Sequence, residues 1–463
     1  MKPTQFLPML KYQALFDLNL KVSHQERALL PTSEAGKVAL DAKLLSLLQL
    51  ASGRELNEIL DSFADGEATP DAVRAALACL AEAGLLTRLG ETPTRPTPQP
   101  AVGPLVSAVI VTYNSQEWLG ECLPSLFSQS YSELEVIAVD NASSDGSADW
   151  LKMNCPQVRL LRLDRAQSLA YAINQGVALA KGTYFLLLNP DVRLQPDAVA
   201  HMVATAQDDP SCAAVTAKLK FWWAPAFLNG LGNRVEAFSW GTDNAVGHLD
   251  LGQFDSWCEV PSACFAAALI PRAAWDRVGP LDSGFPLYYE DSEWSYRARL
   301  LGYTVRAAPQ AVIYHAFGGR VPSGAEDGLT PRKLRQVAYG RLRFATKILS
   351  QTFLRRFLRN YLREDYRNFS RALRRREWAT ARAYLSAWWD SVRGLPALMP
   401  ERRALQARRA RSDEELFALQ QGMPAPLMWH GLPELTWDLV LHHYLPLFHA
   451  GKTRPVPEFQ SDL

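Results

Sequence analysis

Polar side chains that could do chemistry follow several apolar runs of this sequence. The segment LLLNPDV, residues 186–192, ends in the single carboxylate of Asp191 behind a proline. A strand that stops at Asn-Pro-Asp places this carboxylate just past the edge of a sheet, where open α/β sheets bind ligands. Hard cations such as Mg²⁺ prefer one or two protein carboxylates together with phosphate oxygens and water. Asp191 is therefore a candidate metal ligand, and an Asp that only starts a turn before Pro196 is the alternative.

Two earlier apolar runs end in polar residues that could hold a nucleotide. Because consecutive strands of one crossover unit lie side by side, the ends of residues 105–114 and 134–143 should meet at one edge of a sheet. Carboxylates and amides there can hydrogen bond to a uracil-like base, and an aromatic ring can stack on it. The alternative is an Asx turn that caps the next helix, with Asp145 and Ser147 as capping residues. The candidate residues are Thr112, Tyr113, Asn114, Asp140, Asn141 and Asp145.

A further set of carboxylates lies in GPLDSGFPLYYEDSEWSYRARLLG, residues 279–302. Glu290, Asp291 and Glu293 follow an aromatic run and precede a helical pattern. An acidic first turn is expected in any helix, because the helix dipole favours it. Burial beside the aromatic residues would instead raise a carboxyl pKa and suit the group to act as a base near neutral pH. Both interpretations stay open from the residues alone, and His315 in IYHAFGG could equally be a core or loop histidine.

Alternating strand and helix patterns must position these residues. Short apolar runs rich in β-formers are typical of buried parallel strands, and helical patterns separate them. The strand patterns are 105–114, 134–143, 158–164 and 183–192, and the helical patterns are 117–129, 146–154 and 168–182. The alternation predicts an α/β domain over residues 105–330, with a doubly wound, mostly parallel sheet and right-handed crossovers.

The region before this domain reads as a small module followed by a linker. Its helical patterns are 40–52 and 70–86, and its strand-like runs are 16–22 and 27–33. Thr69 is placed as the N-cap of the second helix and Gly84 as its stop. This content predicts a winged-helix-like domain over residues 1–90. Residues 91–104 carry five prolines and are typical of a stiff, extended linker.

The region after the α/β domain is basic. Residues 331–421 have the pattern of long, Arg-rich amphipathic helices, with 22 basic and five acidic residues between Arg332 and Arg411. This imbalance indicates a partner of negative charge. Such helices could dock on anionic lipid headgroups, and a bundle with a solvated basic face is the alternative. Residues 422–463 form a C-terminal tail of short apolar pieces to which we assign no fold.

Composition narrows the class of protein. A hydrophobic content of 48% and a net charge of +1 are ordinary for a globular protein. Six cysteines without CxxC pairs indicate reduced thiols and a cytoplasmic location. We find no signal peptide and no apolar stretch of the about 18 residues that a bilayer span needs, so membrane contact would be peripheral, at the inner face of the cell membrane. The N-terminal module has nine basic and twelve acidic residues before residue 92. Its net charge is therefore negative, which disfavours binding to nucleic acid.

Five segments in this order resemble glycosyltransferase family 2. They are VIVTYN, VDNASSDGS, LLLNPDV, GPLDSGFPLYYEDSEWSYRARLLG and HAFGG. The resemblance covers about residues 105–320 and is strongest to the rhamnosyltransferase-like branch, which has Asn-Pro-Asp in place of the usual Asp-x-Asp. It implies a GT-A fold, a nucleoside-diphosphate-sugar donor, a hexosyltransferase type of activity and inversion at the anomeric carbon.

The resemblance also implies roles for individual residues. Asp291 matches the catalytic base, and Asp191 with His315 would hold a divalent metal, Mg²⁺ or Mn²⁺, on the donor diphosphate. The remaining residues of the nucleotide-sugar site would be Thr112, Tyr113, Asn114, Asp140, Asn141, Asp145, Asn189, Asp191 and Glu290. We expect Asn189 not to be a second metal ligand. Asp291 would then remove a proton from an acceptor hydroxyl, which attacks the sugar carbon from the face opposite the diphosphate.

The chain departs from the family pattern in places that bear on its substrates. DRAQSLAYAINQG replaces a Gly-rich turn near the donor, which puts the donor contacts of Asp164 and Arg165 in doubt. Glu293 stands where an Asp is usual. The aromatic, Gly-rich insertion at residues 220–254 is expected to line the sugar or acceptor pocket.

Three kinds of acceptor or role follow from the flanking regions. The basic helices resemble the extension of membrane-associated family members, which favours a lipid-linked or cell-surface glycan as acceptor. The N-terminal module weakly resembles the peptide-binding chaperone of pyrroloquinoline quinone synthesis, which would favour a ribosomal peptide or peptide-derived cofactor, as in mycofactocin-type enzymes, bound by strand addition. A non-catalytic nucleotide-sugar-binding protein is the remaining alternative.

Overall fold

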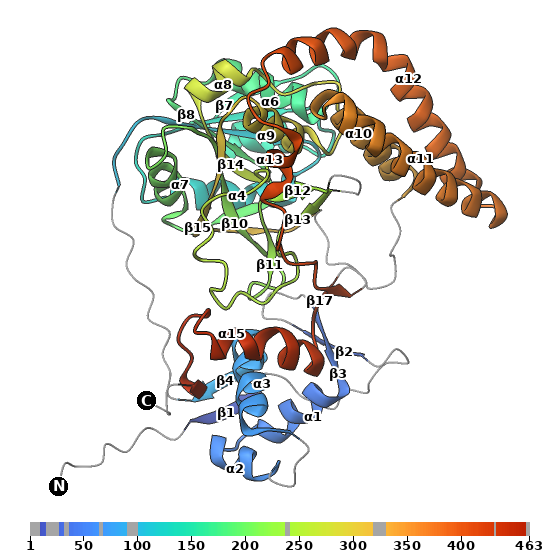
Figure 1. The fold of residues 1–463 in the computed structure, drawn as a ribbon. Coiled ribbons are helices and arrows are strands. Elements are labelled where there is room, and N and C mark those ends of the chain that lie inside the picture. The colour runs from blue at the N-terminus through green and yellow to red at the C-terminus, as the bar shows by residue number, and fades with distance from the viewer. Residues whose placement is uncertain are drawn as a thin grey trace.

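The computed structural model describes residues 10–14, 27–31, 37–63, 68–89, 101–236, 241–317, 330–429 and 432–459. Its centre is a nine-stranded sheet in the order β7-β6-β5-β8-β14-β10-β15-β9, with β11 paired to β10. Helices cover both faces of this sheet, and two further bodies lie beside it (Figure 1). The α/β fold class expected from the sequence is confirmed.

The first half of the sheet is parallel. It consists of β5 (Val106–Thr112), β6 (Leu134–Asp140), β7 (Arg159–Arg162) and β8 (Tyr184–Leu188). The connecting helices are α4 (Gln116–Phe127), α5 (Ser147–Asn154) and α6 (Leu169–Leu179). Every residue of β5 and β8 is buried, as the continuous apolar runs predict. Each of these elements begins within one residue of the pattern read from the sequence, and each ends zero to four residues before the pattern does.

The second half of the sheet is mixed, and the sequence did not predict its order. β14 (Ala267–Pro271) lies antiparallel between β8 and β10 (Cys212–Phe221), and β10 pairs in parallel with β15 (Thr304–His315). Short β9 (Val192–Leu194) pairs with the end of β15, and β11 (Leu228–Leu231) with β10. The order brings His315 at the end of β15 next to the LLLNPDV segment.

Two apolar layers hold the helices to the sheet. One layer contains Val106, Ala108 and Ile110 of β5 together with α4, α5 and α7 (Ala198–Gln207). The other contains Val109 and Val111, whose side chains point to the opposite face, together with α6, α8 (Arg272–Val278) and α9 (Glu290–Leu300). Helix α9, which starts at Glu290, is therefore anchored in the core beneath the candidate base.

The N-terminal module shares its core with the C-terminal tail. The module contains α1 (Ala42–Ala51), α2 (Leu56–Asp61), α3 (Pro70–Glu82), the pair β1 (Lys11–Ala14) and β4 (Leu86–Leu89), and the pair β2 (Arg27–Pro31) and β3 (Lys37–Asp41). In the tail, β17 (Leu432–Leu435) extends this second pair by lying parallel to β3, and β16 (Met428–Trp429) lies beyond it. The tail continues through α14 (Trp437–Leu439), a π-helical turn Val440–Tyr444 and α15 (Leu445–His449), and this stretch packs beside α3 (Figure 1).

The content of the N-terminal module partly matches the expectations. Thr69 caps α3 by accepting a hydrogen bond from the Ala72 amide, and Gly84 has a φ of +70°, as expected for a helix stop. The strand expected at 27–33 is present as β2. The strand expected at 16–22 and most of the linker expected at 91–104 lie outside the described residues. The winged-helix assignment and the domain boundaries remain our interpretation.

The basic region forms long helices, as expected. They are α10 (Pro331–Ile348), α11 (Gln351–Arg374), α12 (Trp378–Ala407) and the short α13 (Asp413–Ala418). Helix α10 packs on α9 and on α12, and the α11–α12 hairpin projects away from the sheet (Figure 1). Among the described residues, none of these or the other helices has a long enough apolar stretch to cross a membrane.

Candidate active site

Asp145 holds together the first turns of two helices where the parallel strands β5 and β6 end. We call this side of the sheet the parallel edge. Its carboxylate accepts hydrogen bonds from the Gln116 amide at the start of α4, at 2.9 Å, and from the Ser147 amide and hydroxyl at the start of α5, at 2.9 and 2.5 Å. Burial would raise the pKa of Asp145, but these hydrogen bonds outweigh it and lower the pKa. The carboxylate is thus engaged as a helix cap, and its contact with a nucleotide remains a prediction.

The neighbouring polar residues of this edge are also paired within the chain. Asn141 exchanges two hydrogen bonds with the backbone of Gln167, at 2.8 and 3.0 Å. Asp140 is fully buried, and its carboxylate accepts from the Thr112 hydroxyl and the Ser143 amide, both at 3.3 Å. These bonds align the ends of β5 and β6, whose register places Thr112 opposite Asp140.

A small hollow opens beside these strand ends. It has a volume of about 280 Å³ and is lined by Ala142, Ser143, Arg162, Leu163 and Asp164. Arg162 lies 3.6 Å from the Asp140 carboxylate, and Tyr113 at the end of β5 is 54% exposed. The arrangement offers an exposed ring, a guanidinium and backbone groups at the sheet edge, which is where an open α/β sheet binds its ligand. Arg165, adjacent to this hollow in sequence, is exposed.

Asp191 and His315 face each other across the end of the sheet. The antiparallel pairing of β9 with β15 places Val192 opposite His315, and the Ala316 amide donates to the Asp191 carbonyl at 3.0 Å. The Asp191 Oδ1 atom lies 3.4 Å from His315 Nε2. Two residues 124 positions apart in sequence are therefore brought together by one strand pair.

The second nitrogen of His315 is oriented by an asparagine that the sequence analysis did not single out. His315 Nδ1 lies 2.7 Å from the side-chain oxygen of Asn229 on β11. Because an amide oxygen can only accept, this contact requires a proton on Nδ1, and Nε2 is the nitrogen that faces Asp191. A metal-binding histidine typically has this arrangement, with its other nitrogen donating to a fixed oxygen.

The side chains of Asp191 and His315 are chemically suited to bind a divalent metal. Carboxylate oxygen and neutral imidazole nitrogen are both ligands for Mn²⁺, and carboxylate oxygen is a ligand for Mg²⁺. Within the described ranges, no group of three or more His, Cys, Asp or Glu side chains could hold a metal ion. A metal held by Asp191 and His315 would thus have coordination positions left for substrate oxygens and water. None of these contacts involves the side chain of Asn189.

The turn before α9 has a strained backbone. Tyr288 and Tyr289 both have positive φ, at +68° and +70°, a conformation that costs free energy in non-glycine residues. Gly340 of α10 packs on this turn, because a Cβ there would lie 3.1 Å from the Tyr289 ring and 3.3 Å from the Tyr288 carbonyl. Helix α9 then begins at Glu290, so the strained turn is clamped by a neighbouring helix.

Asp291 is held by an amide from the insertion. The Asn233 side chain donates to Asp291 Oδ2 at 2.7 Å, and the Ser292 amide contacts Oδ1 at 2.6 Å. Asn233 in turn accepts from the Ser292 hydroxyl at 3.2 Å. Burial raises the pKa of Asp291, and these hydrogen bonds oppose the rise without cancelling it. Asp291 remains half-buried rather than sealed, so the carboxylate is oriented, has an elevated pKa and keeps some access.

Glu290 is more deeply buried than Asp291 and is less satisfied. It is 6% exposed, and its Oε2 atom has no hydrogen-bond partner among the described residues. Burial, with the charge of Asp291 as the next cause, raises the pKa of Glu290 to about 8. The raised pKa favours the neutral acid form of the side chain, which can donate one hydrogen bond.

Asp243 links the two halves of the site, and the sequence analysis did not name it. It lies on β13 (Gly241–Asp243), directly opposite Asn233 on β12 (Asn233–Val235). Burial and the charge of Asp291 raise its pKa to about 7, whereas His315 and Arg234 lower it. Since Asp291 and His315 both influence the pKa of Asp243, the candidate base and the candidate metal pair border one site. The only sequence signal was its place in the insertion expected to line the pocket.

The insertion itself divides between the site and a different core. Asn229, Asn233 and Asp243 face the site, whereas the aromatic residues Phe221, Trp223 and Phe227 pack in the core of the N-terminal module and the C-terminal tail. The expectation that the aromatic part lines the sugar or acceptor pocket is thus not met for these three residues. They connect the α/β domain to its neighbour.

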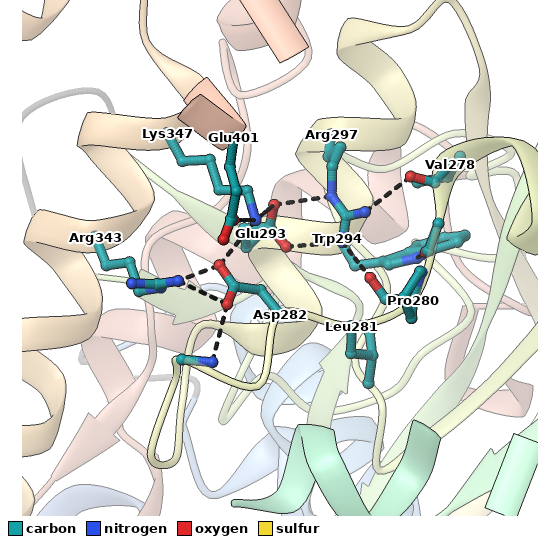
Figure 2. Close-up of polar contacts among 12 residues, drawn as sticks. Val278, Pro280, Leu281, Asp282, Glu293, Trp294, Arg297, Arg343, Lys347 and Glu401 are labelled. Atoms are coloured by element: carbon teal, nitrogen blue, oxygen red, sulfur yellow. Dashed lines mark hydrogen bonds and ion pairs between the residues drawn. The ribbon is translucent and has the colours of Figure 1, made fainter. Parts of the chain in front are cut away.

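Glu293, the third carboxylate of the cluster, belongs to a structural ion network. It forms a two-point pair with Arg297, at 2.8 and 3.0 Å, and lies 3.2 Å from Lys347 of α10 (Figure 2). Lys347 and Arg343 also bind Asp282, each at 2.8 Å. Burial would raise the pKa of Asp282, but these two cations hold it well below its usual range. The network fixes the loop before α9 against α10.

One segment of the chain matches a known protein family, and parts of the chain are similar to curated proteins. Residues 107–229 match the model of the family described as glycosyl transferase family 2. Among curated proteins, GlyG, a glycosyltransferase of Streptococcus pneumoniae, is 34% identical over 90 residues, which is 19% of this chain and 30% of that protein. A poly-beta-1,6-N-acetyl-D-glucosamine synthase of Staphylococcus epidermidis is 23% identical over 212 residues, 45% of this chain and 49% of that protein. The chain thus spans less than half the length of these relatives.

A similar solved structure covers more of the chain. The mannosyltransferase PcManGT from Pyrobaculum calidifontis, in complex with GDP-Man and Mn²⁺, aligns over 82% of this chain and 95% of its own, at 17% identity and a TM-score of 0.40. GalNAc-T7 with UDP, GalNAc and Mn²⁺ aligns over 74% of this chain and 58% of its own, at 15% identity and a TM-score of 0.48.

Proposed function

We propose that this chain, whose residues 107–229 belong to glycosyl transferase family 2, is an inverting, metal-dependent glycosyltransferase. It would move a sugar, of hexose type, from a nucleoside diphosphate to an acceptor hydroxyl. The curated relatives include enzymes named as glycosyltransferases and polysaccharide synthases, which supports this class of reaction. The proposed location is the cytoplasm, which agrees with the six free cysteines.

The geometry around Asp291 is the observation on which the proposal depends. The carboxylate is half-buried, has a raised pKa and is oriented by Asn233 at 2.7 Å. A general base works best when its pKa lies near the working pH, and burial is the usual cause of such a shift in a carboxyl group. Asp291 also lies close enough to Asp243, and Asp243 to His315, for their charges to interact. The base and the metal pair can therefore act on one substrate.

In the proposed reaction, Asp291 accepts the proton of the acceptor hydroxyl. The hydroxyl oxygen forms a bond to the anomeric carbon of the sugar, and the bond from that carbon to the diphosphate oxygen breaks on the opposite face. The electron pair of the broken bond leaves with the nucleoside diphosphate. A single displacement inverts the anomeric carbon, and no covalent intermediate with the protein is needed.

Asp191 and His315 would hold a divalent cation, Mg²⁺ or Mn²⁺. When bound, such a cation neutralises the negative charge that develops on a departing diphosphate. Asn229 would keep His315 in the tautomer that leaves Nε2 available, through the 2.7 Å contact to Nδ1. Asp243 and Glu290 would line the space between this pair and the base, with Glu290 present as a neutral acid.

The nucleotide would lie along the parallel edge of the sheet. Ala142 and Ser143 line the hollow at this edge, and the ring of Tyr113 at the neighbouring strand end is exposed. Asp140, Asn141 and Asp145 would support the site by shaping these loops, because their side chains are bonded to neighbouring segments. Thr112 would act in the same way, through its hydrogen bond to Asp140.

A lipid-linked or cell-surface glycan is the acceptor that we propose. Helix α10 packs against the loop before α9, and α10 and α11 are both basic and amphipathic, which suits an acceptor presented at a membrane surface. A peptide-derived acceptor is favoured by one observation: β2 is the end strand of a sheet in the N-terminal module, and an end strand can pair with an extended peptide.

The experiment is a donor screen with the full chain. Nucleotide release is measured for GDP-, UDP-, and dTDP-sugars with Mn²⁺ or Mg²⁺, for the wild type, for Asp291→Asn and for Asp276→Asn. Asp276 is an exposed carboxylate on α8 and serves as the matched control. We expect one donor to be turned over by the wild type and the control but not by Asp291→Asn. Equal activity, or equal inactivity with every donor, in wild type and Asp291→Asn would contradict the enzyme proposal.

A further inference from the structure

Helix α11 presents a basic surface away from the catalytic domain. All seven of its arginines are exposed, namely Arg355, Arg356, Arg359, Arg363, Arg367, Arg371 and Arg374. In an α-helix with 3.6 residues per turn, most of these residues fall on one broad face. The hairpin that α11 forms with α12 extends away from the sheet domain, on the right-hand side of Figure 1.

The two acidic residues of α11 both bind side chains of neighbouring helices. Glu364 is bound by Arg341 of α10 at 2.8 Å. Asp365 is buried and accepts from the indole nitrogen of Trp388 on α12 at 3.2 Å. The negative charges are thus used in packing α10, α11 and α12 together, while the arginines stay at the surface.

Large apolar side chains form an exposed stripe along α12. Trp378, Leu385, Trp389 and Val392 are 64%, 50%, 67% and 62% exposed. Their spacing of seven, four and three residues places them within about 60° of one another around the helix. A folded protein normally buries side chains of this size, so a continuous exposed stripe indicates a binding surface.

A second apolar stripe on α11 lies beside the first. Leu362, Tyr366 and Leu373 are exposed and share one face of α11, next to the arginines. Leu362 and Val392 line the same apolar hollow of about 220 Å³ between α10, α11 and α12, together with Trp388 and Leu395. The two stripes therefore form one surface, apolar along the middle and bordered by arginines, which we call the hairpin face.

We propose that the hairpin face docks this protein on an anionic lipid bilayer. The arginines would meet the phosphate headgroups, and the tryptophan and leucine side chains would enter the boundary between headgroups and acyl chains. This is the arrangement of amphipathic helices that lie in the plane of a membrane surface. Arginine attracts anionic headgroups, and tryptophan is enriched at such interfaces. A soluble acidic partner would match the arginines but would not need the exposed apolar stripe.

The docked hairpin would be coupled to the candidate active site by rigid contacts. Helix α10 joins the hairpin and also holds the loop before α9 through Arg343 and Lys347 on Asp282, with Glu401 of α12 at 3.2 Å from Lys347 (Figure 2). Docking would therefore set the orientation of this loop, and of Asp291 beyond it, relative to the bilayer. The docking itself does not depend on the proposed transferase activity.

The test is vesicle flotation of the full chain without donor or acceptor. Vesicles of phosphatidylcholine are compared with vesicles that contain about 30% phosphatidylglycerol, at low salt and at about 0.5 M NaCl. We expect binding to the anionic vesicles at low salt, weaker binding at high salt and little binding to neutral vesicles. Absence of binding to the anionic vesicles, or equal binding to both kinds, would overturn the proposal.

Two sets of variants distinguish a bilayer from a soluble polyanion. Arg359→Glu/Arg363→Glu/Arg367→Glu should lower binding at least about tenfold, because three attractive charges become repulsive. Leu385→Ser/Trp389→Ser should lower it several-fold without a change of charge, because apolar contact with the lipid is lost. If the second pair binds anionic vesicles and heparin as well as the wild type does, the surface recognises soluble polyanions and the bilayer assignment is wrong.

Matched controls use residues of similar exposure elsewhere. Lys37→Glu/Arg54→Glu/Lys181→Glu makes the same change of charge at exposed positions outside the hairpin, and Met153→Ser removes an exposed apolar side chain on α5. These controls should bind like the wild type. If they lose as much binding as the hairpin variants, net charge or general hydrophobicity explains the effect and the hairpin face does not. Nucleotide release, measured in parallel, reports on the transferase proposal separately.

Discussion

Two groups of carboxylates in the α/β domain differ in their bonding partners. One group lies at the parallel edge of the sheet, near the ends of β5 and β6, and the other lies at the start of α9. At the parallel edge, Asp145 accepts three hydrogen bonds that cap two helices, and these bonds lower its pKa. At the start of α9, Glu290 has a carboxyl oxygen with no partner in the described part of the chain, and burial raises the pKa of both Glu290 and Asp291.

The difference separates residues that build the site from residues that can react. A carboxylate whose oxygens are filled by backbone donors is stabilised in its charged form and is a poor proton acceptor. A buried carboxylate whose hydrogen bonds do not offset the loss of hydration accepts a proton more readily, at a cost in folding free energy. Carboxylates stand at comparable positions of the sequence in both regions, so the surroundings of each carboxylate decide its role.

The largest expected effect is the loss of activity when Asp291 is replaced. Asp291→Asn keeps the size of the side chain and removes the base, so kcat should fall by about 10²- to 10⁴-fold. The melting temperature should not fall, because the amide relieves a buried carboxylate. Steady-state kinetics and thermal unfolding check both parts. A variant that unfolds as it loses activity would place Asp291 with the structural carboxylates.

The metal pair provides the next comparison. Asp191→Ala and His315→Ala should each weaken Mn²⁺ binding by at least about 10-fold, since each removes a ligand. Asn189→Ala, a neighbour of Asp191 on the same segment, should change it much less. Isothermal titration with MnCl₂ in the presence of the nucleoside diphosphate measures this. Equal losses in Asn189→Ala and Asp191→Ala would make Asn189 a ligand.

The hydrogen bond from Asn233 should be visible in the pH profile. Asn233 stabilises the charged form of Asp291 and so lowers its pKa relative to burial alone. Asn233→Ala removes this bond, and the acidic limb of kcat/KM should move to higher pH. An unchanged limb with a lower maximum would indicate that Asn233 only supports the fold. Asn154→Ala, which breaks an exposed side-chain contact to the Trp150 carbonyl within α5, serves as the control.

On the structural side, Asp145→Ala should mainly reduce stability. Loss of the caps on α4 and α5 should cost about 1–2 kcal/mol for each helix. The pKa of Asp145 is lower in the folded than in the unfolded protein, so its contribution is present above the unfolded pKa and is lost as pH falls through the folded one. Chemical denaturation at pH 7 and at low pH tests both the size and the sign. A fall in kcat without a loss of stability would make Asp145 a direct substrate contact.

The smallest expected effect concerns Glu290. Its pKa rises from 4.5 to about 8 on folding, so the folded state binds an extra proton between these values. Stability from this group should therefore decrease as pH rises through that window. Glu290→Gln should reduce the decrease, measured as the midpoint of urea unfolding from pH 5 to pH 9. An unchanged pH dependence would contradict the raised pKa.

Much of the parallel half of the domain could be predicted because its information is local. Continuous apolar runs of five to seven residues produced β5, β6 and β8 where expected, and alternating helical patterns produced α4 to α6. The second half was not predictable in the same way. β14 inserts antiparallel between β8 and β10, and the insertion supplies β11 to β13, because pairing across such distances depends on which edges remain open.

The sequence by itself determined which residue types stand at the ends of the strands and at the start of α9. It therefore predicted Asp191, Asp291 and His315 as candidates before any contact was known. Only the tertiary structure decided their use, because a carboxylate acts through the charges, donors and solvent around it, and these come from distant segments. Asn229 and Asn233 orient His315 and Asp291, Asp243 connects them, and backbone amides engage Asp145.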